Sequence, residues 1–127
     1  MSTSDTTAWR VMLPSDYEAM QAAGAFLGSP LDLKDGFIHM SPTCAAREVG
    51  RLYFKGEPKL VLLQVDLGKV AAAALRWDFV PSRGVTYPHL YPLDGAPASL
   101  PLAAVTDVHI LTADGDDFSG FPPALSS

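Results

Sequence analysis

The chain has 127 residues, 48% hydrophobic and 18% charged, a size and composition that suit one domain with its own core. Nine Lys and Arg against fourteen Asp and Glu give a net charge of −5, which disfavours duplex nucleic acid and anionic membranes as partners, because both attract a basic face. With Cys44 as the single cysteine, we expect neither an internal disulfide nor a cysteine-based zinc cluster.

The two ends of the chain are rich in small polar residues, glycine and proline. We therefore expect residues 1–127 to form one domain with an ordered core at about 8–111 and flexible tails at 1–7 and 114–127. The first residues lack the basic start and apolar centre of a secretory signal. No stretch approaches the about 20 apolar residues of a membrane-spanning helix. These features predict a cytoplasmic protein.

The first predicted element is a strand at residues 8–13, in which apolar side chains alternate. A helix should follow from Ser15, because Glu18 completes a capping box with it, and Gly24 is typical of a helix C-terminus. Residues 28–35 are then expected to form a loop that ends in a sharp turn.

A short strand is predicted at residues 37–40, followed by a helix from Ser41 to about residue 54. Ser41 offers a hydroxyl for the N-cap and Pro42 suits the first helical position. One face of this helix is apolar and is expected to point inward. Its members are Ala45, Val49, Leu52 and Tyr53.

The second half of the chain consists mainly of short strands. Residues 60–67 are nearly continuous aliphatic and predict the most buried strand. Residues 68–75 should form one or two helical turns, and strands are expected at 76–80, 87–91 and 104–111. Five or six short strands with two modest helices, in irregular alternation, predict an α+β fold.

The first candidate cluster is centred on His39. In a strand, Phe37 and His39 point to one face, and His39 lies just before the predicted helix start at Ser41. Such a helix N-terminus offers free backbone N–H groups and partial positive charge to a phosphate or carboxylate. Alternatively, His39 is a hydrogen-bonded structural residue and Ser41 only an N-cap.

The second candidate cluster is the segment 86–91. Tyr87, His89 and Tyr91 stand at alternate positions and should share one strand face. Aromatic faces stack on flat heterocycles, and the imidazole supplies a donor or acceptor beside them. A half-buried edge strand would explain the same residues without a ligand.

Other types of site have weaker support. The glycines form no phosphate-binding loop. Cys44 with a histidine could make a nucleophile, but it falls in the first turn of a predicted amphipathic helix, where a buried or capping thiol is commoner. The three histidines His39, His89 and His109 lack the spacing of zinc ligands. Further polar candidates rest on position alone. They are the carboxylates Asp66 and Asp78 and the possible anion ligands Arg76 and Arg83.

Together these motifs resemble the bacterial domain of unknown function family 952. The resemblance spans residues 9–111, and its motifs are the segment 35–41, the aliphatic strand ending in Asp66, the pair Trp77-Asp78 and the segment 88–91. It implies membership of the ADP-ribosyltransferase-like superfamily, an α+β fold in which two small sheets form a cleft for a nicotinamide dinucleotide.

The resemblance also implies roles for some residues. In transferases of that superfamily a histidine holds a ribose hydroxyl, and His39 matches it. An aromatic residue stacks on the nicotinamide, a role open to Tyr53, Tyr87 or Tyr91. The Glu or Gln that orients the ribose has no match, since the last strand offers only Asp107 and the family's usual Trp-Glu is Trp77-Asp78 here.

We therefore expect a cleft that binds a nucleotide-like ligand, NAD or a relative, and acts at a ribose as a transferase or glycohydrolase. His39 and His89 are the catalytic candidates. The ligand-binding candidates are Ser41, Tyr53, Tyr87, Tyr91 and Arg83. One alternative is a binding module that has lost the transferase carboxylate, and another is a metal-dependent hydrolase using the two histidines. The nucleotide hypothesis requires these histidines to lie within about 10 Å, given hydrogen-bond reach. The oligomeric state is left open.

Overall fold

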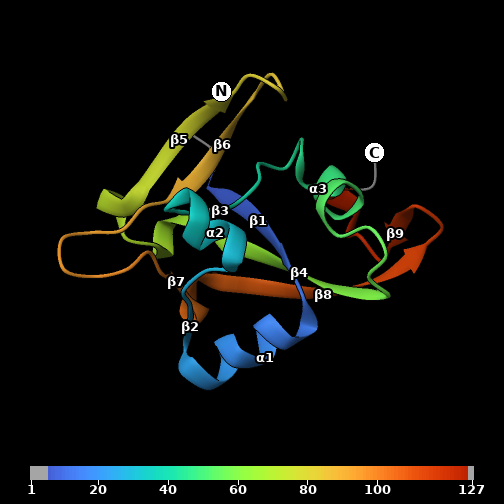
Figure 1. The fold of residues 1–127 in the computed structure, drawn as a ribbon, viewed down its shortest axis with the longest axis horizontal. Coiled ribbons are helices and arrows are strands. Elements are labelled where there is room, and N and C mark those ends of the chain that lie inside the picture. Colours follow the sequence, from blue (N-terminus) through green and yellow to red (C-terminus); the bar gives the residue numbers. More distant parts are fainter. Residues whose placement is uncertain (1–5, 126–127) are drawn as a thin grey trace.

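The computed structural model describes residues 6–125, which form three antiparallel sheets and short helices (Figure 1). The largest sheet has the strand order β1-β4-β8-β9. Its strands are β1 (Thr7–Met12), β4 (Lys59–Asp66), β8 (Val105–Asp114) and β9 (Asp117–Ser119). Because α-helices and these sheets alternate irregularly along the chain, the fold is α+β, as the sequence predicts.

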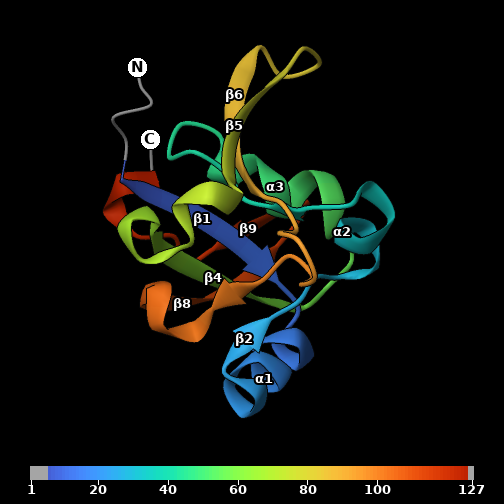
Figure 2. The same ribbon diagram turned by 90° about the vertical axis from the view of Figure 1, so that its left-hand side faces the viewer.

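A second sheet carries the chemistry-bearing segments, in the order β3-β6-β5. Its strands are β3 (Ile38–His39), β5 (Leu75–Val80) and β6 (Val85–Leu90). The β5–β6 hairpin projects from the body of the molecule, at the end opposite the first helix (Figures 1 and 2). The third sheet is the pair β2 (Ala25–Phe26) and β7 (Leu100–Pro101).

Three α-helices surround the sheets: α1 (Pro14–Ala23), α2 (Pro30–Asp35) and α3 (Ala46–Tyr53). Four short 3₁₀ turns are also present among the described residues, at Leu67–Lys69, Ala72–Ala74, Leu102–Ala104 and Pro123–Leu125. Within residues 6–125, none of the helices is long and apolar enough to cross a membrane.

Strand β4 divides the interior into two cores, as its aliphatic sequence leads one to expect. Leu60 and Leu62 pack with α3 on one face of the large sheet, whereas Val61 and Leu63 pack with α1 on the other. All four are at most 2% exposed. Because successive side chains of a strand point to opposite faces, only a strand covered on both sides can be apolar throughout.

The helix boundaries differ from the sequence prediction in two places. The first helix is capped by Leu13 rather than Ser15, without a side-chain hydrogen bond, although it ends at Gly24 as predicted, with φ of 82°. The capping box stands instead at Ser29 and Asp32, where it begins α2 inside the predicted loop. The same pattern of a hydroxyl residue and an acid three positions later thus caps a helix at Ser29 but not at Ser15.

The predicted helix start at Ser41 is also wrong. Ser41 forms a β-bridge with Trp9, in which each backbone N–H donates to the other's carbonyl at 2.8–2.9 Å. Helix α3 begins only at Ala46. Its predicted inward face is split, because Leu52 is 46% and Tyr53 60% exposed.

The segment 114–125 belongs to the fold, contrary to the flexible tail expected there. Strand β9 pairs with β8, and Phe118 and Leu125 are 4% and 3% exposed within the core on the α3 side. Although the segment is polar and rich in proline, these two buried side chains attach it to the core. The other flexible tail was expected at residues 1–7: Thr7 instead begins β1, where it pairs with Asp66, and residues 1–5 lie outside the described residues.

Replacing Gly120 by alanine is expected to test the packing of this segment. Gly120 has φ of 107°, and a Cβ there would lie 2.5 Å from the carbonyl oxygen of Ile110. Gly115 also has positive φ, 64°, but its Cβ would meet nothing within 4 Å. Gly120→Ala should therefore lower the free energy of unfolding by about 1–3 kcal/mol more than Gly115→Ala. If urea denaturation gave the same loss of unfolding free energy for both variants, the close approach of residue 120 to the Ile110 carbonyl would be contradicted.

Candidate functional site

A cleft of about 560 Å³ lies where β1, α2, α3 and the β5–β6 hairpin meet. Its volume is in the range of small-molecule sites. Six of the seven site residues expected from the sequence line it, and the list is His39, Ser41, Tyr53, Arg83, Tyr87 and His89. The seventh, Tyr91, stands behind the wall. The fold therefore brings most of the candidates to one cavity.

The two catalytic candidates are neighbours. Strand β3 pairs with β6 so that His39 lies opposite His89, and their ring centroids are 5.3 Å apart. This separation is well inside the limit of about 10 Å that one shared ligand group allows. The Phe37 ring packs beside both, with centroids 4.6 Å from His39 and 4.3 Å from His89. The two imidazoles can thus face the same small group.

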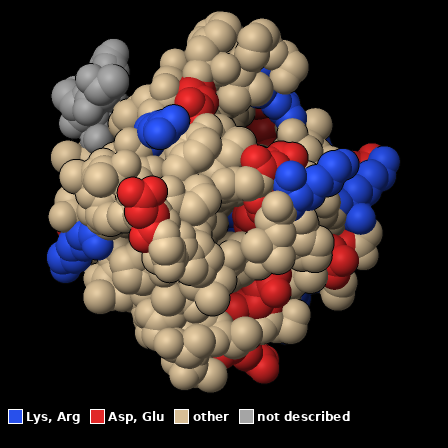
Figure 3. All heavy atoms as spheres, turned by 60° about the vertical axis from the view of Figure 1, so that its left-hand side comes forward, with Lys and Arg blue, Asp and Glu red and all other residues tan. Residues whose placement is uncertain are grey.

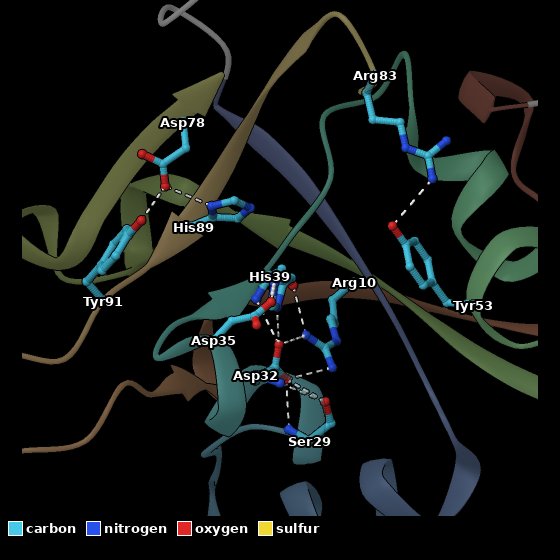
Figure 4. Close-up of polar contacts among 10 residues, drawn as sticks. All are labelled: Arg10, Ser29, Asp32, Asp35, His39, Tyr53, Asp78, Arg83, His89 and Tyr91. Carbon is cyan, nitrogen blue, oxygen red and sulfur yellow. Dashed lines mark hydrogen bonds and ion pairs between the residues drawn. The ribbon is translucent and has the colours of Figure 1, made fainter. Parts of the chain in front are cut away.

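Asp32, which is 2% exposed, anchors His39. Its Oδ1 accepts from Nη1 of Arg10 at 2.9 Å and from the backbone N–H of His39 at 3.0 Å. The same oxygen lies 2.7 Å from Nδ1 of His39. Its Oδ2 accepts from the Ser29 backbone and hydroxyl and pairs with Nη2 of Arg10 at 2.8 Å (Figure 4).

This network determines the charge of Asp32. Burial alone would raise the pKa of its carboxyl, but the hydrogen bonds from His39 and Arg10 and the positive charge of Arg10 outweigh burial and hold the pKa well below its usual range. The ion pair is fully formed inside the protein, since the Arg10 side chain is 9% exposed. Asp32 therefore fixes both the backbone and the ring of His39.

The second ring nitrogen of His39 meets Asp35. Nε2 lies 2.9 Å from Oδ2 of Asp35, so a carboxylate oxygen faces each nitrogen of the ring. A carboxylate can only accept, so both contacts are hydrogen bonds when the ring carries two protons. In this arrangement His39 presents no free lone pair to a ligand, which suits a positioning role better than that of a base.

His89 is arranged differently. Its Nδ1 lies 2.8 Å from Oδ2 of Asp78, and Tyr91 donates its hydroxyl to that same oxygen at 2.5 Å. No group among the described residues bonds Nε2, which lies on the ring edge away from Asp78 (Figure 4). When Nδ1–H donates to Asp78, Nε2 keeps a lone pair toward the cleft. This is the geometry of a general base.

The pKa shifts agree with that role. Burial lowers the pKa of His89 and outweighs the hydrogen bond to Asp78, so the ring favours its neutral form. Burial would raise the pKa of the Asp78 carboxyl, but hydrogen bonds from Tyr91 and His89 hold it below its usual value. Burial and the bond to Asp78 raise the pKa of Tyr91 to about 12, so its hydroxyl stays a donor.

Ser41 lines the cleft without the anion site expected of it. Its backbone N–H is used in the bridge to Trp9, so no helix N-terminus points at a ligand from this position. Its side chain is 7% exposed, and its hydroxyl makes no hydrogen bond within residues 6–125. Ser41 can therefore contact a ligand through the hydroxyl alone.

The mouth of the cleft is spanned by Arg83 and Tyr53. Arg83, at the tip of the hairpin, donates to the Tyr53 hydroxyl at 3.4 Å and lies 3.9 Å from Glu48 of α3. The Arg83 guanidinium also stands 5.9 Å from the centre of the Tyr53 ring. Tyr87 lines the wall below, with its ring 6.4 Å from that of His89. The hairpin and α3 thus touch across the opening.

The other candidates lie elsewhere. Asp66 accepts from the backbone of Gly68 as a turn cap, and Cys44 is exposed. His109 packs near Trp9, and its buried Nε2 has no partner in the described part of the chain. Over residues 6–125 there is no group of three or more His, Cys, Asp or Glu that could hold a metal ion.

Sequence reasoning missed Arg10 and Asp32, which support His39. Arg10 stands in a strand of otherwise buried side chains, and a charge at such a position signals a buried partner. That partner, Asp32, lies 22 residues further along the chain. It follows Ser29-Pro30, a pattern that would have predicted a helix N-terminus there. Phe37 carries no polar signal at all.

Charged side chains make up 18% of the sequence. The face drawn in Figure 3 is mostly uncharged, and acidic side chains are interspersed among the basic ones. Four carboxylates and two guanidinium groups line the cleft, and the list is Asp16, Asp32, Asp35, Glu48, Arg10 and Arg83. The lining is therefore acidic on balance.

Comparisons with known proteins give relatives of the same fold. The family described as "Protein of unknown function (DUF952)" matches residues 11–108. The crystal structure of protein CC0527 from Caulobacter crescentus is 33% identical, with 89% of this chain and 92% of that chain covered and a TM-score of 0.77. The solution NMR structure of the same protein is 32% identical, with coverage of 90% and 91% and a TM-score of 0.71. No curated protein matches.

Proposed function

Because this chain belongs to the DUF952 family, whose description assigns no activity, we propose from its cleft that it binds a nucleotide-like ligand, NAD or a relative, and acts at the ribose. One observation carries the proposal. His39 and His89 lie side by side, ring centroids 5.3 Å apart, and only His89 keeps a nitrogen free for the ligand. In such a pair Nε2 of His89 can take a proton from a bound hydroxyl or water, while His39, whose nitrogens face Asp32 and Asp35, forms a fixed wall beside it.

The cleft suits this class of ligand in size and character. Its volume of about 560 Å³ can bury a nucleoside-sized molecule. The rings of Phe37, Tyr53 and Tyr87 line it and offer faces on which a flat heterocycle can stack. In the ADP-ribosyltransferase-like fold a cleft also lies between two small antiparallel sheets, and we propose that this chain has that fold.

The proposed reaction breaks the bond between ribose C1′ and the nicotinamide nitrogen. The bonding electrons stay on the pyridine nitrogen, so nicotinamide leaves neutral. Water or an acceptor hydroxyl forms the new bond to C1′ and gives its proton to Nε2 of His89, while Asp78 holds Nδ1–H. Positive charge builds on the ribose ring, and the carboxylates of the lining stabilise it.

A non-catalytic binding module is the second candidate. The observation in its favour is that both ring nitrogens of His39 already face carboxylates, which makes His39 a fixed part of the wall. The last strand also lacks the Glu or Gln expected of a transferase. By contrast, the hypothesis of a metal-dependent hydrolase finds no ligand group among the described residues.

Titration with NAD at millimolar concentration tests the proposal. We expect the melting temperature to rise and free nicotinamide to accumulate. His39→Ala should abolish the rise while the far-UV circular dichroism spectrum stays native, whereas His109→Ala, away from the cleft, should keep it. Binding without nicotinamide release would favour the binding module. No rise in melting temperature with any nicotinamide nucleotide would overturn both candidates.

A further inference from the structure

The charges that line the cleft favour a positively charged ligand. Of its two guanidinium groups, Arg10 is held by both oxygens of Asp32, and Arg83 is shared between Tyr53 and Glu48. Each guanidinium thus has a carboxylate beside it, which weakens its attraction for a phosphate. Asp16, in contrast, lines the cleft without a side-chain partner among the described residues. An anionic group would therefore enter a field of the wrong sign.

The same cleft is rich in aromatic faces. Trp9, Phe37, Tyr53 and Tyr87 all line it. The negative face of an aromatic ring attracts a cation, most strongly where water is excluded. Aromatic faces combined with carboxylates form the usual surroundings of a bound organic cation, while a neutral flat ring would gain the stacking alone.

Two polar atoms of largely buried residues open into the cleft without a hydrogen-bond partner among the described residues. Ser41 is 7% exposed, and its hydroxyl is unbonded within the described residues. His89 is 4% exposed, and its Nε2 is likewise unbonded there. Both atoms are open to the cavity, so ligand hydroxyl groups can bond the Ser41 side chain while Nε2 of His89 takes the proton of the attacking water. A sugar next to the cationic ring would supply these hydroxyl groups.

We propose that the cleft selects a cationic nucleoside: a positively charged ring joined to a ribose, with any phosphate left outside the cavity. The inference rests on the proposed function and narrows its ligand class. The ring lies against the aromatic and acidic lining, and the ribose hydroxyls reach Ser41, which leaves Nε2 of His89 to the attacking water. The carboxylates that attract the cationic ring are then in place when its charge passes to the ribose during bond cleavage.

The test compares, by titration calorimetry, ligands of similar shape whose rings differ in charge. Nicotinamide riboside carries a cationic ring, and its reduced dihydro form has a neutral ring of nearly the same shape. We expect the cationic form to bind about tenfold more tightly, since one charge near a carboxylate in a partly wet site contributes about 1–2 kcal/mol. Nicotinamide mononucleotide, which adds a phosphate, should bind no more tightly than the riboside.

Matched variants locate the charge effect. Asp16→Asn and Asp35→Asn each remove one carboxylate of the lining and should reduce the preference for the cationic ring by about threefold to fivefold. Asp107→Asn removes an exposed carboxylate outside the lining and should leave it unchanged. Equal affinity for both ring forms, or a tenfold gain from the phosphate, would overturn this inference while the proposed function stands. If no nicotinamide compound binds, both fall.

Discussion

Replacing Asp32 by asparagine is expected to lower the free energy of unfolding by about 3–5 kcal/mol, because it leaves the buried Arg10 guanidinium without its counter-charge. The two oxygens of Asp32 contact Arg10, His39 and Ser29. An amide has almost the same shape but offers one acceptor atom and no charge. Urea denaturation followed by tryptophan fluorescence measures the loss.

Two comparisons make the result specific. Asp107→Asn, at an exposed position, should change the free energy of unfolding by less than about 0.5 kcal/mol. The Asp32 carboxyl has a pKa well below its usual value in the folded protein, so its contribution is present above about pH 4 and is lost as the pH falls further. Asp32→Asn should remove that part of the acid sensitivity. A loss below about 1 kcal/mol would contradict the buried ion pair.

Replacing Asp78 by asparagine is expected to lower the rate of nicotinamide release by about 10²–10⁴-fold, with little change in ligand affinity. The asparagine amide can donate to Nδ1 of His89, which places the imidazole proton on Nε2 and removes the free lone pair. Tyr91→Phe, which deletes one hydrogen bond to Asp78, should cost less, about tenfold. Steady-state kinetics separate kcat from KM, and an unchanged kcat in Asp78→Asn would exclude this dyad.

The pH profile provides a second readout of the same dyad. Because burial lowers the pKa of His89, the native rate should rise along an acid limb whose midpoint lies below the ordinary histidine value of about 6.5. In Asp78→Asn that limb should move, because the hydrogen bond that favours the protonated ring is lost. A variant defective only in folding would lose amplitude without a change in midpoint.

The longer strands could be predicted because their signals are local, whereas the short strands β2, β7 and β9 were not predicted. The aliphatic run that forms β4 and the alternating segments that form β1 and β6 required no knowledge of the rest of the chain. The helix start at Ser41 failed for the opposite reason. Its backbone pairs with Trp9 from a distant part of the sequence, and a β-bridge uses the N–H group that a helix N-terminus would have left free.

For the candidate site, the sequence identified the individual residues but not their arrangement in space. His39 and His89 stood out because each is a polar residue in an apolar strand, yet nothing in either segment shows that the two strands pair. Asp78 was a candidate by position alone, and its role depends on the registry of β5 with β6, which brings it diagonal to His89. Tyr91 was predicted at the ligand but lies behind Asp78.

Leu52 and Tyr53 can be substituted at little cost in stability. Both line the cleft, yet they are 46% and 60% exposed and belong to neither core. Substitutions at such positions usually leave stability within about 0.5 kcal/mol, whereas the histidine wall is tied to a buried ion pair. Substitutions at these two positions of α3 can therefore change ligand specificity while the wall formed by the histidines keeps its structure. A library of variants at Leu52 and Tyr53 should yield altered ligand preference without the need for additional stabilising mutations.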